Sequence, residues 1–403
     1  MTGKKKYRRI LLIVLAILFV LCVAAGYQAL RNSLPDQLYI DRNQEQPLSP
    51  LTEHPLVTVS ESTEVSAGDG SYFLTCRIGK IIPLKNVKVI PTNRQQVNVC
   101  GVPVGIYMET DGIMVIDTAA IPTSDGLKVN PAENIVKSGD YLKSVNGTKL
   151  QSKRELVQLV TESDGSPMEL ILERNGEEIK VKVTPAKAAD GEYKLGIWVR
   201  DNIQGIGTLT YVKQDGSFGA LGHGVSDVDT GEMLHLGEGE LYLADILQVV
   251  KGKEGSPGEL QGVIHYEEKN RIGKITGNSG LGIIGSIDPE AMELLPLETM
   301  EIAYKQEIEK GPACIMVCID GEVKSYEAQI TEIHMNAQDS NKSFTLQVTD
   351  QELIQKTGGI IQGMSGSPII QNGKLVGAVT HVLVNDPTKG YGIFIENMLD
   401  AAG

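Results

Sequence analysis

Ten Asx-Gly pairs are spread along this 403-residue sequence, and they constrain its fold more than any other feature. Asn or Asp followed by glycine is the preferred two-residue connection of a β-hairpin, because glycine adopts positive φ angles without strain. The segments between the pairs contain runs of β-branched residues, which favour strands. The pattern therefore predicts a mainly β protein. The pairs begin at Asp69, Asp111, Asp125, Asn146, Asp164, Asn175, Asp190, Asp215, Asp320 and Asn372.

The N-terminus departs from this pattern. Residues 10–25 form an unbroken apolar run, which extends to Leu30 with Gln28 as its only polar residue. About 20 apolar residues in a helix span the hydrocarbon core of a bilayer. Residues 1–30 are therefore predicted to be a basic cytoplasmic end followed by a transmembrane or signal-anchor segment. Cleavage as a signal peptide after the small residues at 23–25 is the alternative.

The charges beside the apolar run predict its orientation. Only Arg31 follows the run closely, whereas five cations precede it, so the N-terminus is expected in the cytoplasm and the rest of the chain outside the membrane. The preceding cations are Lys4, Lys5, Lys6, Arg8 and Arg9.

The charge of the remaining chain excludes one class of function. Without those five cations the chain keeps 32 of its 37 Lys and Arg residues against 51 Asp and Glu residues, a net charge of −19. Binding to nucleic acid requires cations that displace phosphate counterions. The acidic body is therefore predicted not to bind nucleic acid.

Residues 31–75 are polar and interrupted by prolines, which predicts a tether followed by the first strands. Residues 100–185 have the organisation of a separate unit. Ser152 and Glu155 form a capping box that begins an amphipathic helix, and a hairpin turning at Asn175 closes the unit. Together with the Gly-Asp and Asn-Gly pairs of the stretch 139–147, this order resembles a PDZ domain of the kind attached to bacterial proteases.

The PDZ resemblance implies a peptide-binding groove. The backbone N–H groups of Val104, Gly105 and Ile106 are expected to hold a peptide C-terminus, and the groove beside helix 152–163 to accept an added strand. Residues 186–403 are predicted to form a further β domain, with strands from 56–99 available to complete it. Trp198, the only tryptophan, is predicted to anchor the core of that domain.

A serine lies between glycines in the segment 357–370. The pattern Gly-x-Ser-Gly-x-Pro, from Gly363 to Pro368, suits a serine protease of the chymotrypsin architecture. Gly363 permits a tight turn, so that the N–H groups of Gly363 and Ser365 can point into one oxyanion pocket. Ser365 is the predicted nucleophile, and Ser367 is the alternative, although it lacks the preceding Gly-x. An ordinary turn between two strands is the non-catalytic alternative.

A candidate base precedes this serine by 142 residues. His223 lies between two glycines, which allow the backbone to bring the imidazole close to another group. Serine becomes a strong nucleophile when a base takes its proton, and the base needs a third group that fixes its tautomer. His381 follows Ser365 closely enough to line the same pocket.

The third group of such a triad is less well determined by the sequence. An aspartate between His223 and Ser365 would give the order His, Asp, Ser found in chymotrypsin. Asp245, 22 residues after His223, is a candidate on sequence distance alone. Asp227 and Asp229 are assigned to the loop that follows the histidine.

Taken together, these features resemble the stage IV sporulation protein B peptidase family, serine endopeptidases of endospore-forming bacteria related to chymotrypsin. The resemblance covers essentially the whole chain and is most specific at 357–368. It implies an N-terminal membrane segment, a PDZ-like domain and a double β-barrel protease domain, with His223, Asp350 and Ser365 as the catalytic triad.

The family resemblance also implies a signalling role and a set of partners. Such a protease is exported into the space between the forespore and mother-cell membranes, and cleaves itself near its N-terminus. It also cleaves a regulator of a membrane-embedded metalloprotease, which releases processing of a late sigma factor precursor. A non-catalytic PDZ scaffold and a general envelope protease for unfolded chains are the alternatives.

No metal and no cofactor are predicted. Cys314 and Cys318 lie on one strand face, and their spacing, with Cys76 and Cys100, matches no zinc motif.

Overall fold

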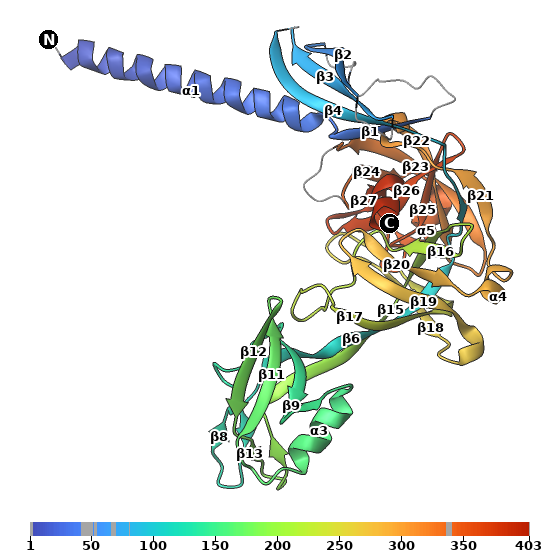
Figure 1. Cartoon of the computed structure of the whole chain (residues 1–403). Helices are drawn as coiled ribbons and strands as arrows, with labels where there is room; N and C mark the ends of the chain where they lie inside the picture. Colours follow the sequence, from blue (N-terminus) through green and yellow to red (C-terminus); the bar gives the residue numbers. More distant parts are fainter. Residues whose placement is uncertain are drawn as a thin grey trace.

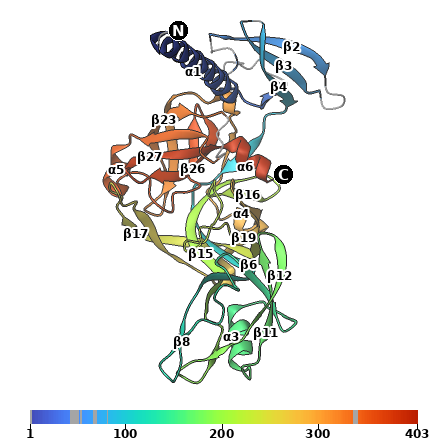
Figure 2. The same cartoon turned by 90° about the vertical axis from the view of Figure 1, so that its left-hand side faces the viewer.

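The computed structural model describes residues 3–41, 51, 55–65, 70–79, 81–335 and 341–402. Strands predominate, as the Asx-Gly pairs predicted. Figure 1 shows a long N-terminal helix, a small sheet beside it, a central β body and a smaller unit at the opposite end; Figure 2 shows the same order from the side. Of the tether predicted over 31–75, residues 42–50, 52–54 and 66–69 lie outside the described residues.

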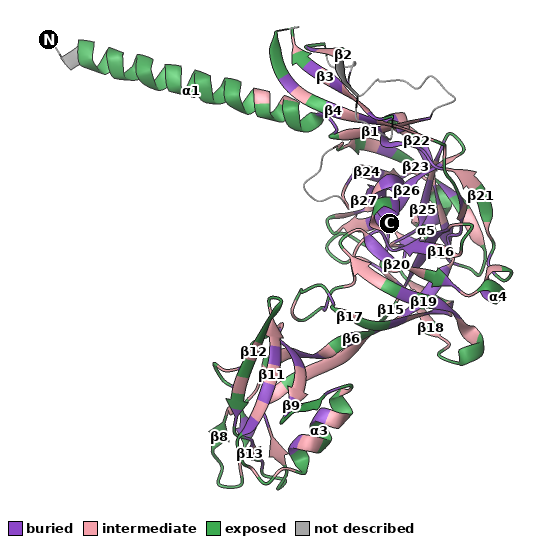
Figure 3. Ribbon diagram, in the orientation of Figure 1, coloured by how far each residue is buried: buried purple, intermediate pink, exposed green. Residues whose placement is uncertain are grey.

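Helix α1 (Gly3–Ser33) is the predicted membrane segment. Its portion Lys5–Ser33 is long and apolar enough to cross a bilayer. None of its most apolar window packs inside the protein, and Figure 3 shows the helix exposed along almost its whole length. An apolar helix whose most apolar part is exposed suits a lipid environment, where the backbone hydrogen bonds are satisfied within the helix.

The N-terminal sheet follows α1 and has a hydrophobic core of its own. Its strand order is β1-β4-β3-β2, and β1 pairs with β4 in parallel. Leu38, Leu74, Val87 and Val89 are among the buried residues of this core. Of the strands in 56–99, only β5 (Gln96–Val99) joins the central body. The strands of the N-terminal sheet are β1 (Gln37–Asp41), β2 (Val57–Val65), β3 (Tyr72–Ile78) and β4 (Ile82–Thr92).

The central body contains a first barrel. Its six strands pair in the order β6-β17-β19-β20-β16-β15, and the pairing of β6 with β15 closes the ring. Alternate residues of β6, such as Val104, Ile106 and Met108, are buried in its core, as the period of a strand requires. The strands are β6 (Pro103–Thr118), β15 (Ile197–Val212), β16 (Ser217–Ala220), β17 (Leu236–Val250), β19 (Arg271–Ser279) and β20 (Gly282–Ile287).

Several short elements surround the first barrel. Strand β18 extends β17, whereas β5 and β21 extend the sheet beyond β15. These elements are β18 (Glu259–Ile264), the 3-10 helix η1 (Glu268–Asn270), α4 (Pro289–Met292), β21 (Glu298–Glu301) and the 3-10 helix η2 (Lys305–Glu307).

The second barrel is a closed ring in the order β22-β23-β24-β27-β26-β25. Phe344, Leu346 and Val348 alternate into its core from β24. The two barrels confirm the double-barrel fold that the family resemblance implied. The elements are β22 (Gly311–Cys318), β23 (Val323–Ile333), β24 (Phe344–Val348), α5 (Gln351–Thr357), β25 (Pro368–Gln371), β26 (Lys374–Leu383), β27 (Asp386–Phe394) and α6 (Ile395–Ala401).

The PDZ-like unit lies between β6 and β15 in the sequence. Both strands continue out of the first barrel, and Thr118 of β6 pairs with Ile197 of β15 at the entrance to the unit. Ser152 caps helix α3 by accepting a hydrogen bond from Glu155 N, which confirms the predicted start of this helix. The elements are β7 (Ile121–Pro122), β8 (Lys128–Val129), β9 (Tyr141–Val145), β10 (Thr148–Lys149), α3 (Lys153–Thr161), β11 (Met168–Arg174), β12 (Glu177–Val183), β13 (Ala186–Lys187) and β14 (Tyr193–Lys194).

Candidate active site

A cavity of about 440 Å³ lies where the two barrels meet. The first barrel and its loops contribute His223 and Gly224, and the second contributes Ser365, Thr380 and His381. The structure thus brings the predicted nucleophile and the predicted base to one cavity, although they are 142 residues apart in the sequence. We call this the active-site cavity.

The imidazole of His223 is fixed by its own loop. Its Nδ1 lies 2.8 Å from Gly224 O. Because a carbonyl oxygen only accepts hydrogen bonds, Nδ1 carries the proton and Nε2 is left as an acceptor. Burial lowers the pKa of His223, and the bond to Gly224 O opposes this shift only in part. The neutral form, which a general base requires, is therefore favoured.

A glycine before this histidine is required by the packing. Gly222 has φ of +71°, and a Cβ there would lie 2.8 Å from an Ile393 side-chain atom and 2.9 Å from one of Thr380. Both neighbours belong to the second barrel, so Gly222 lets the His223 segment approach it closely. His381, on β26, also contacts the base: the two imidazole centroids are 5.1 Å apart, with the rings tilted by 39°.

Residues 358–367, between α5 and β25, carry Ser365 and are called the nucleophile loop; strand β15 of the opposite barrel holds this loop. Thr208 N donates to Ser365 O at 2.9 Å, and Thr208 Oγ1 donates to Gly363 O at 2.9 Å. Thr210 Oγ1 donates to Gly366 O at 2.7 Å. A Cβ at Gly366 would lie 2.1 Å from Thr208 O, so only glycine fits there. The sequence contained no local signal for Thr208 and Thr210, because these contacts join segments about 155 residues apart.

In this structure the Ser365 hydroxyl donates to Thr380 O at 3.0 Å. The predicted oxyanion donors have the conformation that the sequence suggested at Gly363, whose φ is +96°. Neither Gly363 N–H nor Ser365 N–H donates a hydrogen bond to another described residue. Both donors are thus available to a developing oxyanion, and their role stays a prediction.

The alternative nucleophile, Ser367, is fully buried and does not line the active-site cavity. Its Oγ makes no hydrogen bond within the described residues. The buried position of Ser367, away from the cavity, therefore supports Ser365 as the nucleophile.

The structure does not bring the predicted acid to the base. Asp350 is the N-cap of α5: its Oδ1 accepts from Leu353 N at 3.0 Å and its Oδ2 from Glu327 N at 3.3 Å. Asp245, the alternative, accepts from His265 Nε2 at 2.8 Å at an exposed site. Among the described residues that line the active-site cavity none is acidic. The role of Asp350 as triad acid stays a prediction, and Gly224 O is the group that holds Nδ1 here.

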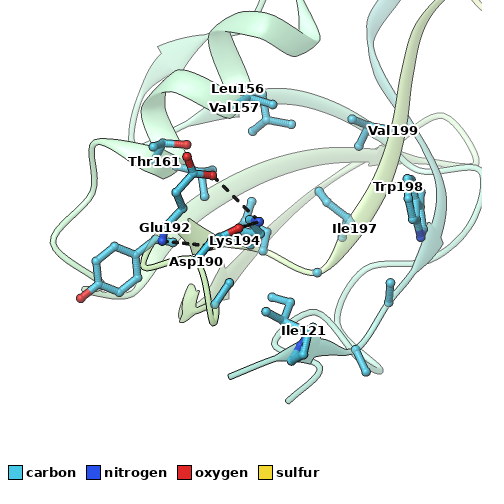
Figure 4. Close-up of a pocket in the computed structure, with 18 of the residues that line it drawn as sticks. Ile121, Leu156, Val157, Thr161, Asp190, Glu192, Lys194, Ile197, Trp198 and Val199 are labelled. Atoms are coloured by element: carbon cyan, nitrogen blue, oxygen red, sulfur yellow. Dashed lines mark hydrogen bonds and ion pairs between the residues drawn. The ribbon is translucent and has the colours of Figure 1, made fainter. Parts of the chain in front are cut away.

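The PDZ-like unit contains a second, larger cavity of about 560 Å³. We call it the groove cavity; it lies against α3, where the PDZ resemblance placed a peptide groove. Figure 4 shows Leu156 and Val157 of α3 on one side and Ile197, Trp198 and Val199 of β15 on the other. Its lining is mostly apolar, as expected for a site that binds peptide side chains.

Two predictions about this region need correction. Val104, Gly105 and Ile106 do not line the groove cavity; they are central residues of the first barrel, where β15 and β17 pair with both edges of β6. Their N–H and C=O groups face neighbouring strands instead of a peptide C-terminus. Trp198 is not a core anchor, since 67% of its surface is exposed.

Two closed β-barrels with a serine and a neutral histidine in the cavity between them define a chymotrypsin-type serine peptidase. The sequence agrees with this class: the model of the family described as SpoIVB peptidase S55 matches residues 191–399, just over half of the chain. The chain therefore belongs to this family, and it is a peptidase.

Similarity to individual proteins is local. A putative zinc metalloprotease of Lactococcus lactis is 38% identical over 71 residues, which cover 17% of this chain and 16% of the relative. The regulator of sigma-W protease RasP of Bacillus subtilis is 33% identical over 63 residues, 16% of this chain and 15% of the relative. The chain thus spans about a sixth of the length of these curated relatives.

Two solved structures show weak similarity. The PDZ domain of an SdrC-like protein from Listeria monocytogenes is 18% identical, covering 22% of this chain and 87% of its own, with a TM-score of 0.18. The inactive form of the Rv3671c protease is 15% identical, covering 49% of this chain and 84% of its own, with a TM-score of 0.29.

Proposed function

We propose that Ser365 is the nucleophile and His223 the general base of a membrane-tethered serine endopeptidase. The observation that carries this proposal is the shared active-site cavity: it is lined by Ser365, on a tight glycine-framed turn, and by His223, whose imidazole is held through Nδ1 and leaves Nε2 as the acceptor. The candidate membrane helix α1 supports tethering.

The chemistry follows from the groups present. The Ser365 hydroxyl leaves Thr380 O and donates its proton to His223 Nε2 while its oxygen attacks the scissile carbonyl. The N–H groups of Gly363 and Ser365 stabilise the resulting oxyanion. His223 then gives the proton to the leaving amine, and a water molecule, activated by the same imidazole, hydrolyses the acyl-enzyme.

The biological role is proposed from family membership together with the membrane helix. The body lies outside the cytoplasmic membrane, between the forespore and mother-cell membranes, and cleaves its own N-terminal tether. Its further substrate is a regulator of a membrane-embedded metalloprotease, and cleavage of this regulator leads to processing of a late sigma factor precursor. The groove cavity presents peptide C-termini to the protease.

Substitution of the two serines tests the enzyme proposal. Ser365→Ala should lower peptide hydrolysis on the order of 10⁴-fold or more, because it removes the attacking atom. Ser367→Ala is the matched control: it removes only a buried hydroxyl without a hydrogen bond, and should leave the rate near that of the natural protein. Hydrolysis of casein and cleavage of the chain's own tether are the measurements. Processing by Ser365→Ala at the natural rate would instead support the non-catalytic scaffold.

A further inference from the structure

The segment that follows the base, residues 224–235, is tied by one arginine to the strand that enters the PDZ-like unit. We call this segment the His223 loop. Arg200 of β15 contacts Asp227 Oδ2 through Nη1, and its Nη2 lies 2.7 Å from Asp229 Oδ2. A guanidinium presents donors in a fixed planar fork, so it can hold two carboxylates in a defined geometry.

The His223 loop is held together by several hydrogen bonds, so the position of its outer part bears on the position of His223. Asp227 is 1% exposed, and its Oδ1 accepts from Asp229 N at 3.0 Å and Thr230 N at 2.9 Å, which confirms its assignment to the loop. Where the two ends of the loop meet, the side chain of Asn278 on β19 bonds to Val225 N and also to the carbonyls of Val225 and Leu234. The loop is thus bonded within itself and to the first barrel directly after the segment that carries His223.

The far end of the loop lies against the PDZ-like unit. His235 stacks on Tyr141 of β9, with ring centroids 4.5 Å apart and planes within 2°. His235 N also donates to the Tyr141 hydroxyl at 3.1 Å. Arg200 and this stacked pair therefore fix the His223 loop at two places next to the PDZ-like unit.

Strand β15 joins all the parts of this arrangement. Its first residues, Ile197 to Val199, line the groove cavity, and Arg200 follows them directly. Eight residues further on, Thr208 holds the nucleophile loop. Along its length, strand β15 thus first lines the groove cavity, then contacts the His223 loop and then contacts the nucleophile loop.

We propose that Arg200 is a positioning residue that sets the place of His223 through Asp227 and Asp229. The inference rests on the proposed role of His223 as base. Without Arg200, the buried Asp227 carboxylate loses its cationic partner, and the loop must shift to bring that charge to water. A displacement of the base by about 1 Å can cost on the order of 10²-fold in rate.

The test uses the full chain in detergent and an alkyl fluorophosphonate, which reacts with a serine that a base has activated. The maximal rate of Ser365 labelling reports the alignment of His223, whereas the half-saturating concentration reports binding of the reagent. Arg200→Ala should lower the maximal rate about 10- to 100-fold with little change in half-saturation. Arg200→Lys should be intermediate, because a lysine holds only one carboxylate at a time.

Two further variants keep the test decisive. Asp229→Asn should lower the maximal rate in the same direction but less, and its half-exposed site makes misfolding a small risk. Arg271→Ala is the matched control: Arg271 also pairs with acidic residues, Glu240, Glu268 and Asp288, and among the described residues none of these partners belongs to the His223 loop, so its variant should label normally. Thermal melting verifies that each variant is folded.

The outcomes separate this inference from the proposed function. If Arg200→Ala and Asp229→Asn both fold and label at the natural maximal rate, Arg200 does not position the base. If Arg200→Ala does not fold, Asp229→Asn decides alone. Labelling that persists at the natural rate in Ser365→Ala would instead overturn the choice of nucleophile.

Discussion

At the residue scale, the site depends on backbone groups as much as on side chains. Gly224 O fixes the tautomer of His223, and Thr380 O accepts from the Ser365 hydroxyl. In the chymotrypsin triad the first of these tasks belongs to a carboxylate, which also stabilises the imidazolium that forms during reaction. A carbonyl supplies orientation and a partial charge, so it accounts for the tautomer of His223 but gives less stabilisation to its protonated form.

A substitution of Asp350 by asparagine tests its two possible roles, as the cap of α5 and as the acid of the catalytic triad. Asn keeps the helix cap through Oδ1 but places an NH2 group where Oδ2 accepts from Glu327 N, so Asp350→Asn should lower the unfolding free energy less than Asp350→Ala, which should cost about 1 kcal/mol. The kcat of folded Asp350→Asn then reports the loss of the charge. A fall on the order of 10⁴-fold would support Asp350 as the acid, and an unchanged kcat would leave Gly224 O as the orienting group.

The sequence was informative about residues whose role depends on local backbone geometry. The glycine-framed His223 and Ser365 were predicted because positive φ angles and tight turns leave a sequence signature. Arg200 and Asp227 were not predicted to act together, because an ion pair between separate segments leaves no signature in the local sequence. Asp350 was chosen by resemblance, and its observed helix-capping role follows from a local pattern that the prediction did not consider.

At the scale of elements, α6 docks on the second barrel with a buried carboxyl group. Glu396 is 3% exposed, and the nearest cation, Lys305 Nζ, is 3.8 Å away. Burial raises the pKa of Glu396 to about 7, although Lys305 opposes this shift. Helix α6 therefore carries a group that is protonated in the folded protein at a pH where an unfolded chain would ionise it.

This carboxyl group predicts a specific dependence of stability on pH. Its contribution is fully present below the ordinary pKa of glutamate, near 4.5, and is lost as pH rises through about 7. Glu396→Gln cannot titrate at this position, so between pH 5 and pH 8 its unfolding free energy should fall by about 2.5 kcal/mol less than that of the natural protein. Denaturant melts at both pH values measure this difference. The control is Glu352→Gln at an exposed site of α5, and an equal effect there would refute the assignment.

Elements were predicted well where their signals are local. The hairpin at Asn175 and the cap of α3 at Ser152 both appear where expected. The error at Val104, Gly105 and Ile106 has a physical cause: Gly105 pairs with Ile206 on one side and Tyr242 on the other, more than 100 residues away. The local sequence of a strand does not show whether other strands pair with both of its edges or leave one edge free for a peptide.

At the scale of the whole molecule, α1 is the candidate membrane span, and its role as a tether can be tested directly. The full chain should stay with membranes after a carbonate wash, whereas a chain that begins at residue 34, and so lacks α1, should be released by the wash. A full-length control with Leu15→Arg and Leu18→Arg should lose membrane retention. Release of the unaltered chain, shortened near residues 23–25, would identify α1 as a cleaved signal peptide.

The way in which the PDZ-like unit is inserted has a consequence for how such proteins diversify. The chain leaves the first barrel at Thr118 and returns at Ile197, directly across a strand ladder. The unit therefore occupies the place of an ordinary hairpin loop, where chains tolerate long insertions. In evolution the PDZ-like unit could be gained, lost or replaced without a change in the strand order of either barrel. Protein engineers could likewise replace the unit to change which peptides the peptidase binds.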